Sequence, residues 1–98
     1  MKRTNTQNLG DILKDFFREN PIVAQKLAET RLINAWEKVI GKAVYRYTES
    51  LYIKNKTLYI RLSSAVLRNE LSLCRSDLIL KLNEEAGMKV IDQIVLIN

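Results

Sequence analysis

The chain has 98 residues, 47% hydrophobic and 28% charged, with one cysteine, no histidine and a formal net charge of +5. A chain this short forms one domain with a single small core, which argues against a deep pocket for a large cofactor. Without histidine, the commonest general base and the Ser/His/Asp and Cys/His catalytic arrangements are excluded. The lone cysteine cannot form an internal disulfide, and no apolar run is long enough to span a membrane. We expect a cytoplasmic, non-enzymatic protein with no metal, cofactor, small-molecule substrate or membrane partner.

The first part of the chain predicts two helices. A second helix is expected to start at Asn20-Pro21, with asparagine as the N-cap and proline in the first turn, and to end at Gly41. Its apolar spacing slips near Thr30, which allows a kink or a new start there. The first helix, over residues 8–18, is indicated by a single apolar stripe at Leu9, Ile12, Leu13, Phe16 and Phe17.

The second part of the chain predicts two strands, a helix and a last strand. Alternating apolar and polar residues from Tyr45 indicate a strand, and the polar residues 55–57 form the turn to a second strand at 58–62. The pair of serines ending at Ser64 would cap a third helix that closes at Gly87. Residues 90–97 are nearly all apolar, as in a strand covered on much of both faces.

These elements define an α+β fold of order α-α-β-β-α-β. The crossover through the third helix should place the last strand parallel to the second, with the first strand antiparallel to it. The expected architecture is a three-stranded mixed sheet with helices packed on one face. We expect residues 1–7 to be flexible and residues 8–98 to form the single domain, with Trp36 as a core anchor.

Positive charge is concentrated in the middle of the chain. The stretch from Lys38 to Arg75 has eight basic and two acidic residues, a net charge of +6, whereas the rest of the chain carries −1. Such a surface can bind a polyanion by displacing condensed counterions, although a merely solvated basic surface has the same composition. Asp11, Asp15 and Glu19 form an acidic line on the first helix that could instead meet a basic partner protein.

The alternation of the two strands places rings and cations on one face of the sheet. Aromatic rings can stack on bases while cations follow the backbone, although cross-strand tyrosine pairs also simply stabilise sheets. Arg68 and Arg75 lie seven residues apart on one stripe of the predicted third helix and would extend the basic patch. The candidate nucleic-acid-binding residues are Lys42, Arg46, Tyr52, Lys54, Lys56, Tyr59, Arg61, Arg68 and Arg75.

Several segments together resemble the DciA-like family of small bacterial proteins. They are Trp36–Gly41, Tyr47-Thr48, Leu58–Ser64, Glu70-Leu71 and the closing strand Val90–Ile97. The resemblance implies a KH-like fold and a role in bacterial chromosome replication. It also implies two partners, DNA (single-stranded DNA included) and the replicative helicase, which such proteins recruit or load, and hence a cytoplasmic, nucleoid-associated location.

The sequence departs from the fuller family pattern in ways that leave alternatives open. It lacks a basic tail after the fold and a tryptophan near Val66, and it has no G-x-x-G loop of the kind with which true KH domains clamp a nucleic-acid backbone. The alternatives are a protein–protein adaptor without direct DNA contact and a KH-like RNA-binding module.

Overall fold

The computed structural model describes residues 6–98, and side chains from Asn8 onward. Residues 1–5 of the expected flexible segment lie outside the described residues, and residues 6 and 7 belong to the first helix. The elements are α1 (Thr6–Glu19), α2 (Pro21–Ile40), α3 (Lys42–Tyr45), β1 (Thr48–Lys54), β2 (Thr57–Leu62), α4 (Ala65–Ser72), α5 (Arg75–Ala86) and β3 (Gln93–Ile97). The α+β class and the overall order of helices and strands are confirmed.

The three strands form one mixed sheet of order β1-β2-β3. Strands β1 and β2 pair antiparallel through a two-residue turn, Asn55-Lys56, in which both residues have positive φ, 52° and 59°. This is the conformation of a type I′ turn, whose twist matches that of the strands. Strand β3 pairs parallel with β2, from Thr57 opposite Gln93 to Arg61 opposite Ile97, as the crossover rule predicts.

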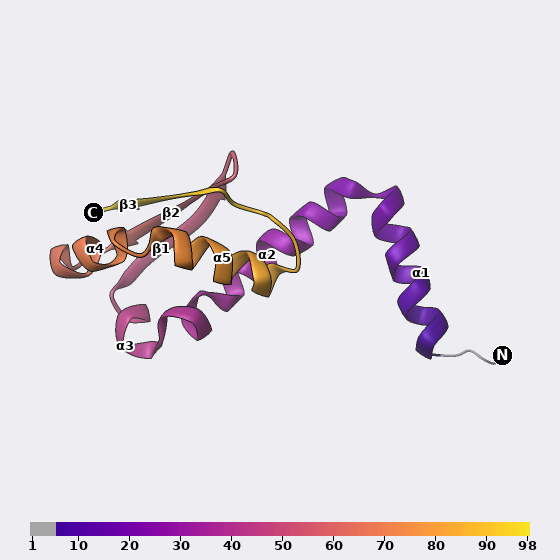
Figure 1. Ribbon diagram of the computed structural model, residues 1–98, viewed down its shortest axis with the longest axis horizontal. Coiled ribbons are helices and arrows are strands. Elements are labelled where there is room, and N and C mark those ends of the chain that lie inside the picture. Colours follow the sequence, from indigo (N-terminus) through magenta and orange to yellow (C-terminus); the bar gives the residue numbers. More distant parts are fainter. Residues whose placement is uncertain (1–5) are drawn as a thin grey trace.

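The core lies between the inner face of the sheet and helices α2 and α5 (Figure 1). Leu58, Ile60 and Leu62 of β2 are fully buried there against Trp36 of α2 and Leu82 of α5. Trp36 is 0% exposed, which confirms it as a core residue. Its ring nitrogen donates a hydrogen bond of 3.0 Å to Thr48 Oγ1, so the indole is buried without leaving an unpaired polar group.

Helix α2 is continuous from Pro21 to Ile40, so the new start allowed at Thr30 does not occur. The Thr30 hydroxyl donates to the Lys26 carbonyl at 3.0 Å, which lets the polar side chain remain within the helix. Pro21 stands in the first turn as predicted, but Asn20 does not cap α2 through its side chain. Instead its amide nitrogen donates to the Phe16 carbonyl at 2.7 Å, at the end of α1. Gly41 (φ 90°) ends α2.

Several predicted boundaries after Gly41 are wrong, including that at Thr57, which was expected in the turn but is the first residue of β2. The strand expected from Tyr45 begins only at Thr48, because residues 42–45 form the short helix α3. The predicted third helix is divided into α4 and α5 at Leu73 and Cys74. There the backbone N–H groups bond to carbonyls three residues back, which tightens the last turn of α4. The predicted Ser64 cap is confirmed, since its hydroxyl accepts from the Leu67 N–H at 3.2 Å.

The last strand begins at Gln93 and not at residue 90. Val90 and Ile91 are buried but lie outside β3, and the side chain of Asn83 holds them. Asn83 Oδ1 accepts from the Val90 and Ile91 N–H groups at 2.9 and 3.1 Å, and Asn83 Nδ2 donates to the Ile91 carbonyl at 2.9 Å. These bonds replace the ladder bonds that the buried segment lacks. Gly87, at φ 83°, ends α5 as predicted.

Candidate nucleic-acid interface

The face of the sheet opposite α2 and α5 carries the predicted combination of rings and cations. Tyr52 lies directly opposite Tyr59, and their rings stack with centroids 4.9 Å apart and an angle of 11° between planes. Tyr52 is 47% exposed, whereas Tyr59 is half-buried because it lies between Tyr52 and Val95 of β3 in the register. The open side of the Tyr52 ring is therefore the surface on which a base could stack. We call the outward side chains of β1, β2 and β3 the outer face.

Lys54 and Lys56 lie at one end of the outer face, at the hairpin tip (Figure 1). Lys54 ends β1, and its side chain is exposed. Lys56 is the second turn residue, and its carbonyl accepts the Asp92 N–H at 2.9 Å, which ties the hairpin tip to the segment before β3. A lysine at φ 59° occupies a backbone conformation that glycine adopts at much lower cost.

Four other candidates lie toward the opposite end of the strands, where α3 and α4 adjoin the sheet (Figure 1). The Ser63 N–H donates to the Tyr47 carbonyl at 3.0 Å, which joins the segment after α3 to the end of β2. Arg68 is half-buried and donates to the Leu62 carbonyl at 2.7 Å, so part of its guanidinium already serves the fold. Arg61 similarly donates to the Asn98 carbonyl. The four residues are Lys42, Arg46, Arg61 and Arg68.

Arg75 does not join these residues. It begins α5 and lines a cleft of about 390 Å³ between α5 and β3, whose other lining residues include Ile79 and Asp92. The prediction that Arg68 and Arg75 share one helical stripe is wrong, because the break at residues 73 and 74 places them on different helices. The strands and their hairpin therefore carry five of the nine candidates, Tyr52, Lys54, Lys56, Tyr59 and Arg61. The other four lie on or beside helices, and Lys42 lines a hollow against α2 with Glu37 and Lys38.

The candidate cations keep their charge available. The ion pairs among residues 8–98 are Arg18–Asp15, Lys26–Glu29 and Lys38–Glu85, and none of them includes a candidate residue. Lys38, which contributes to the basic middle of the chain, is neutralised by Glu85 at 2.9 Å. The acidic line predicted on the first helix is itself interrupted, since Asp15 pairs with Arg18 at 2.7 Å.

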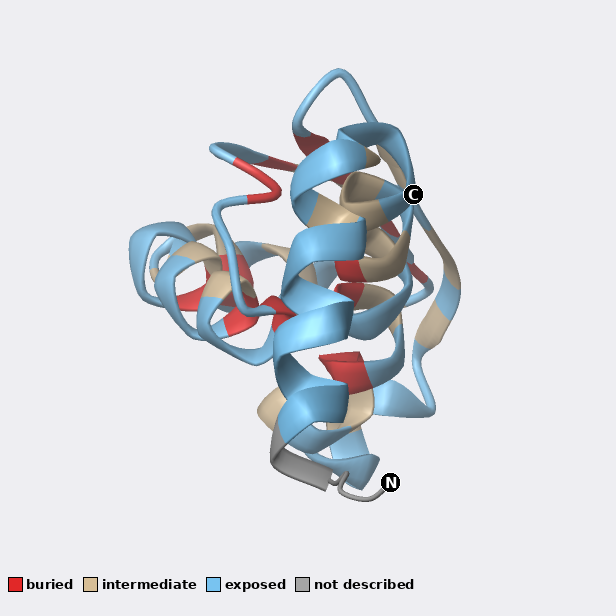
Figure 2. Cartoon of the chain, turned by 90° about the vertical axis from the view of Figure 1, so that its right-hand side faces the viewer, coloured by how far each residue is buried: buried red, intermediate tan, exposed pale blue. Residues whose placement is uncertain are grey.

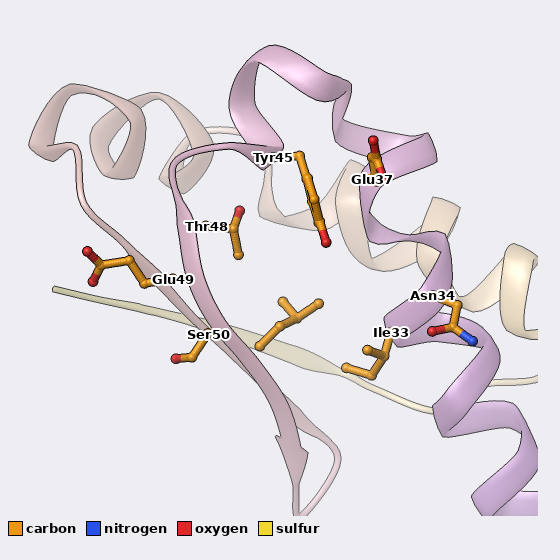
Figure 3. Close-up of a pocket in the computed structure, with 8 residues that line it drawn as sticks. Ile33, Asn34, Glu37, Tyr45, Thr48, Glu49 and Ser50 are labelled. Atoms are coloured by element: carbon orange, nitrogen blue, oxygen red, sulfur yellow. The ribbon is translucent and has the colours of Figure 1, made fainter.

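A groove between α2 and β1 lies outside the outer face (Figure 3). Its volume is about 530 Å³, and no lysine or arginine lines it. Ile33 and Leu51 form an apolar part, the Tyr45 hydroxyl points between strand and helix, and Glu37 stands on the helix side, whereas Glu49 points away (Figure 3). A groove with carboxylates and no cations does not favour a phosphate backbone.

The sequence did not indicate that β3 contributes to the outer face. Residues 90–97 were expected to be covered on much of both faces, but the register places Val95 beside Tyr59 and Ile97 beside Arg61. Both apolar side chains are half-buried, and they extend the outer face beyond the tyrosines. These two residues could have been identified from the sequence: Tyr59 and Arg61 point outward by the alternation of β2, and parallel pairing places Val95 and Ile97 beside them.

The described part of the chain also has a bearing on metal sites and membrane spans. Among residues whose side chains are described, no three of the types His, Cys, Asp and Glu gather where they could hold a metal ion. Over the same part of the chain, none of the helices combines the length and the apolar character needed to cross a membrane.

Comparison with known proteins gives one match. The model of the family described as "Dna[CI] antecedent, DciA" matches residues 8–96. Neither the curated proteins nor the solved structures contain a match to this chain. The match spans nearly the full sequence and includes the buried core residues and all of the outer face except Ile97. The chain therefore belongs to the DciA family.

Proposed function

We propose that this protein is an accessory factor of DNA replication that binds single-stranded DNA through the outer face. Membership of the DciA family supports an accessory role of the helicase-loader type, with the replicative helicase as the protein partner. The contribution of DNA is the finer part of the proposal, and it is argued from the geometry of the outer face.

The observation that carries the proposal is the stacked pair Tyr52 and Tyr59, with Lys54 toward the hairpin tip and Arg61 toward the other end. Lys54 lies opposite Thr57 in the register. A strand rises about 3.3 Å per residue, so the positions of Lys54 and Arg61 are separated by about 13 Å along β2. Cations at both ends of this length can follow a phosphate backbone while a base stacks on the ring of Tyr52. A duplex hides the faces of its bases, which is why we favour a single strand.

The test is a fluorescence anisotropy titration of a labelled single-stranded oligonucleotide at several salt concentrations. Tyr52→Ala should weaken binding by about 5-fold to 100-fold, because stacking contributes about 1–3 kcal/mol per base. Lys54→Ser should both weaken binding and make its salt dependence shallower. The matched control is Lys81→Ser, since Lys81 is exposed on α5, which packs on the inner face of the sheet.

Three results would contradict the proposal. Affinity that does not fall with added salt would exclude the counterion mechanism. Equal effects of Lys54→Ser and Lys81→Ser would show that the charge of the whole protein, and not the outer face, attracts DNA. A clear preference for RNA over DNA of the same length would favour the KH-like RNA-binding alternative.

A second candidate function, a protein adaptor without DNA contact, is favoured by one observation. The groove between α2 and β1 presents Glu37 and apolar side chains, which suit a basic segment of a partner protein. A helicase that remains bound after nuclease treatment, while the isolated protein shows no affinity for the oligonucleotide, would support the adaptor.

A further inference from the structure

Helix α1 presents an apolar stripe that the rest of the chain does not cover. Leu9, Ile12, Leu13 and Phe16 are exposed by 54%, 61%, 46% and 46%. Figure 2 shows α1 toward the viewer, coloured as exposed along nearly its whole length, and Figure 1 shows it projecting from the body that contains the sheet. A helix of 14 residues is marginal in water without tertiary packing. We therefore expect another molecule to cover the stripe.

The corner between α1 and α2 holds α1 in this projecting position. Pro21 has no N–H and cannot continue the first helix, so the chain turns there. The Asn20 N–H donates to the Phe17 carbonyl at 3.2 Å, and the Asn20 side chain donates to the Phe16 carbonyl at 2.7 Å. The Ala24 N–H then donates to the Asn20 carbonyl at 3.1 Å. These bonds satisfy the end of one helix and the start of the next and define the corner from which α1 projects.

The charges of α1 do not favour a membrane or a nucleic acid as the occupant. Asp11, Lys14, Asp15 and Arg18 lie on the side of the helix opposite the stripe. With Glu19, α1 carries three acidic and two basic side chains. Helices that lie on membranes have polar faces rich in lysine and arginine, and a phosphate backbone would require unpaired cations along the stripe.

We propose that a second copy of this chain covers the stripe, with α1 of each copy packed against α1 and the beginning of α2 of the other. Ile22 and Val23, directly after the corner, are 75% and 45% exposed and enlarge the apolar surface. The six side chains expose roughly 600 Å² per copy, so complete mutual coverage would bury about 1,200 Å², which equals the lower limit for a stable interface.

The distribution of charge favours association through α1 over association through the sheet. The outer face and its two ends carry unpaired cations, which repel those of another copy. The nearly neutral α1 has no such barrier. The inference does not depend on the proposed function, because it concerns a surface separate from the outer face and can be tested in the absence of DNA.

The test is sedimentation velocity of the full chain between about 1 and about 100 μM, where an interface of this size is expected to associate. The wild type should change from monomer to dimer in this range. Ile12→Asn and Phe16→Asn should each raise the dimer dissociation constant at least about tenfold, whereas Lys14→Asn, the same new side chain on the charged side, should leave it unchanged. Unaltered Trp36 fluorescence would show that the core is intact.

Two outcomes would overturn the proposal. One is a wild-type chain that stays monomeric throughout the range, which would indicate that a different protein covers the stripe. The other is a dimer unaffected by both stripe variants. An isotope-filtered NMR experiment on mixed labelled and unlabelled chains decides directly, since α1 packing requires contacts between the Phe16 ring of one copy and α1 or α2 methyl groups of the other.

Discussion

Replacing Lys56 with glycine should stabilise the protein and weaken its binding to DNA. Lys56 has φ 59°, in the second position of a type I′ turn, where Asn-Gly is the preferred pair. Relief of the left-handed conformation should raise the free energy of unfolding by about 1 kcal/mol. The same change removes one proposed contact with a phosphate. Each such contact releases about 0.7 counterion from a single strand when it forms, so its loss should lower the affinity at about 0.1 M salt about fivefold. Urea unfolding followed by Trp36 fluorescence and oligonucleotide anisotropy measure the two effects.

The matched control is Lys56→Ser, which removes the charge but keeps a β-carbon in the left-handed conformation. This variant should bind DNA as weakly as Lys56→Gly, with little change in stability. Unchanged affinity in both variants would show that the hairpin tip does not contact DNA. A glycine variant less stable than the wild type would refute the turn-strain argument.

Three further predictions concern stability. Asn83→Ala should lower the free energy of unfolding by about 2–4 kcal/mol in urea, because it leaves the N–H and C=O groups of the Val90–Ile91 segment unpaired, whereas Asn83→Asp, which keeps the acceptor, should cost less. Gly87→Ala should lower the free energy of unfolding by about 1 kcal/mol, because φ at this position is 83°. Gly10→Ala, in the open middle of α1, should increase the helix content measured by circular dichroism. A stabilising Gly87→Ala or a loss of helix in Gly10→Ala would contradict this reasoning. Trp36→Ala should cost about 3–5 kcal/mol in thermal unfolding, and a small shift in Tm would show that the core is not centred there.

The sheet could be predicted from the sequence because its signals are local and agree with one another. Leu58, Ile60 and Leu62 alternate with polar residues, and the short polar turn before them fixes the register with β1. The exact pairing was one residue off: a turn over residues 55–57 places Tyr52 opposite Ile60, whereas the observed two-residue turn places it opposite Tyr59. The direction of β3 then follows from the intervening helical crossover, which parallel strands require.

The remaining details depend on packing that is not visible in a local pattern. The break at Leu73 and Cys74 contains neither proline nor glycine, and the apolar spacing continues in phase across it. The bonds from Asn83 to residues 90 and 91 join positions seven and eight apart, and asparagine on a helix gives no sign of them. The apolar pattern of α1 is the same as that of a helix that packs on a core, so the exposure of these side chains could not be predicted.

The candidate site was predictable in its chemistry but not in its extent. Tyr52, Lys54, Tyr59 and Arg61 share a face because strand alternation alone requires it. Whether helix residues join that face depends on where each helix is placed, and Arg75 is separated by the break between α4 and α5. Their binding roles stay predictions.

The most direct test of DNA binding through the outer face is an amide chemical-shift titration of the labelled protein with a single-stranded oligonucleotide at low salt. If the outer face binds DNA, the amides of Tyr52, Lys54, Tyr59 and Arg61 shift together and return when salt is raised. Shifts confined to the groove between α2 and β1 or to α1, with the outer face unchanged, would contradict it.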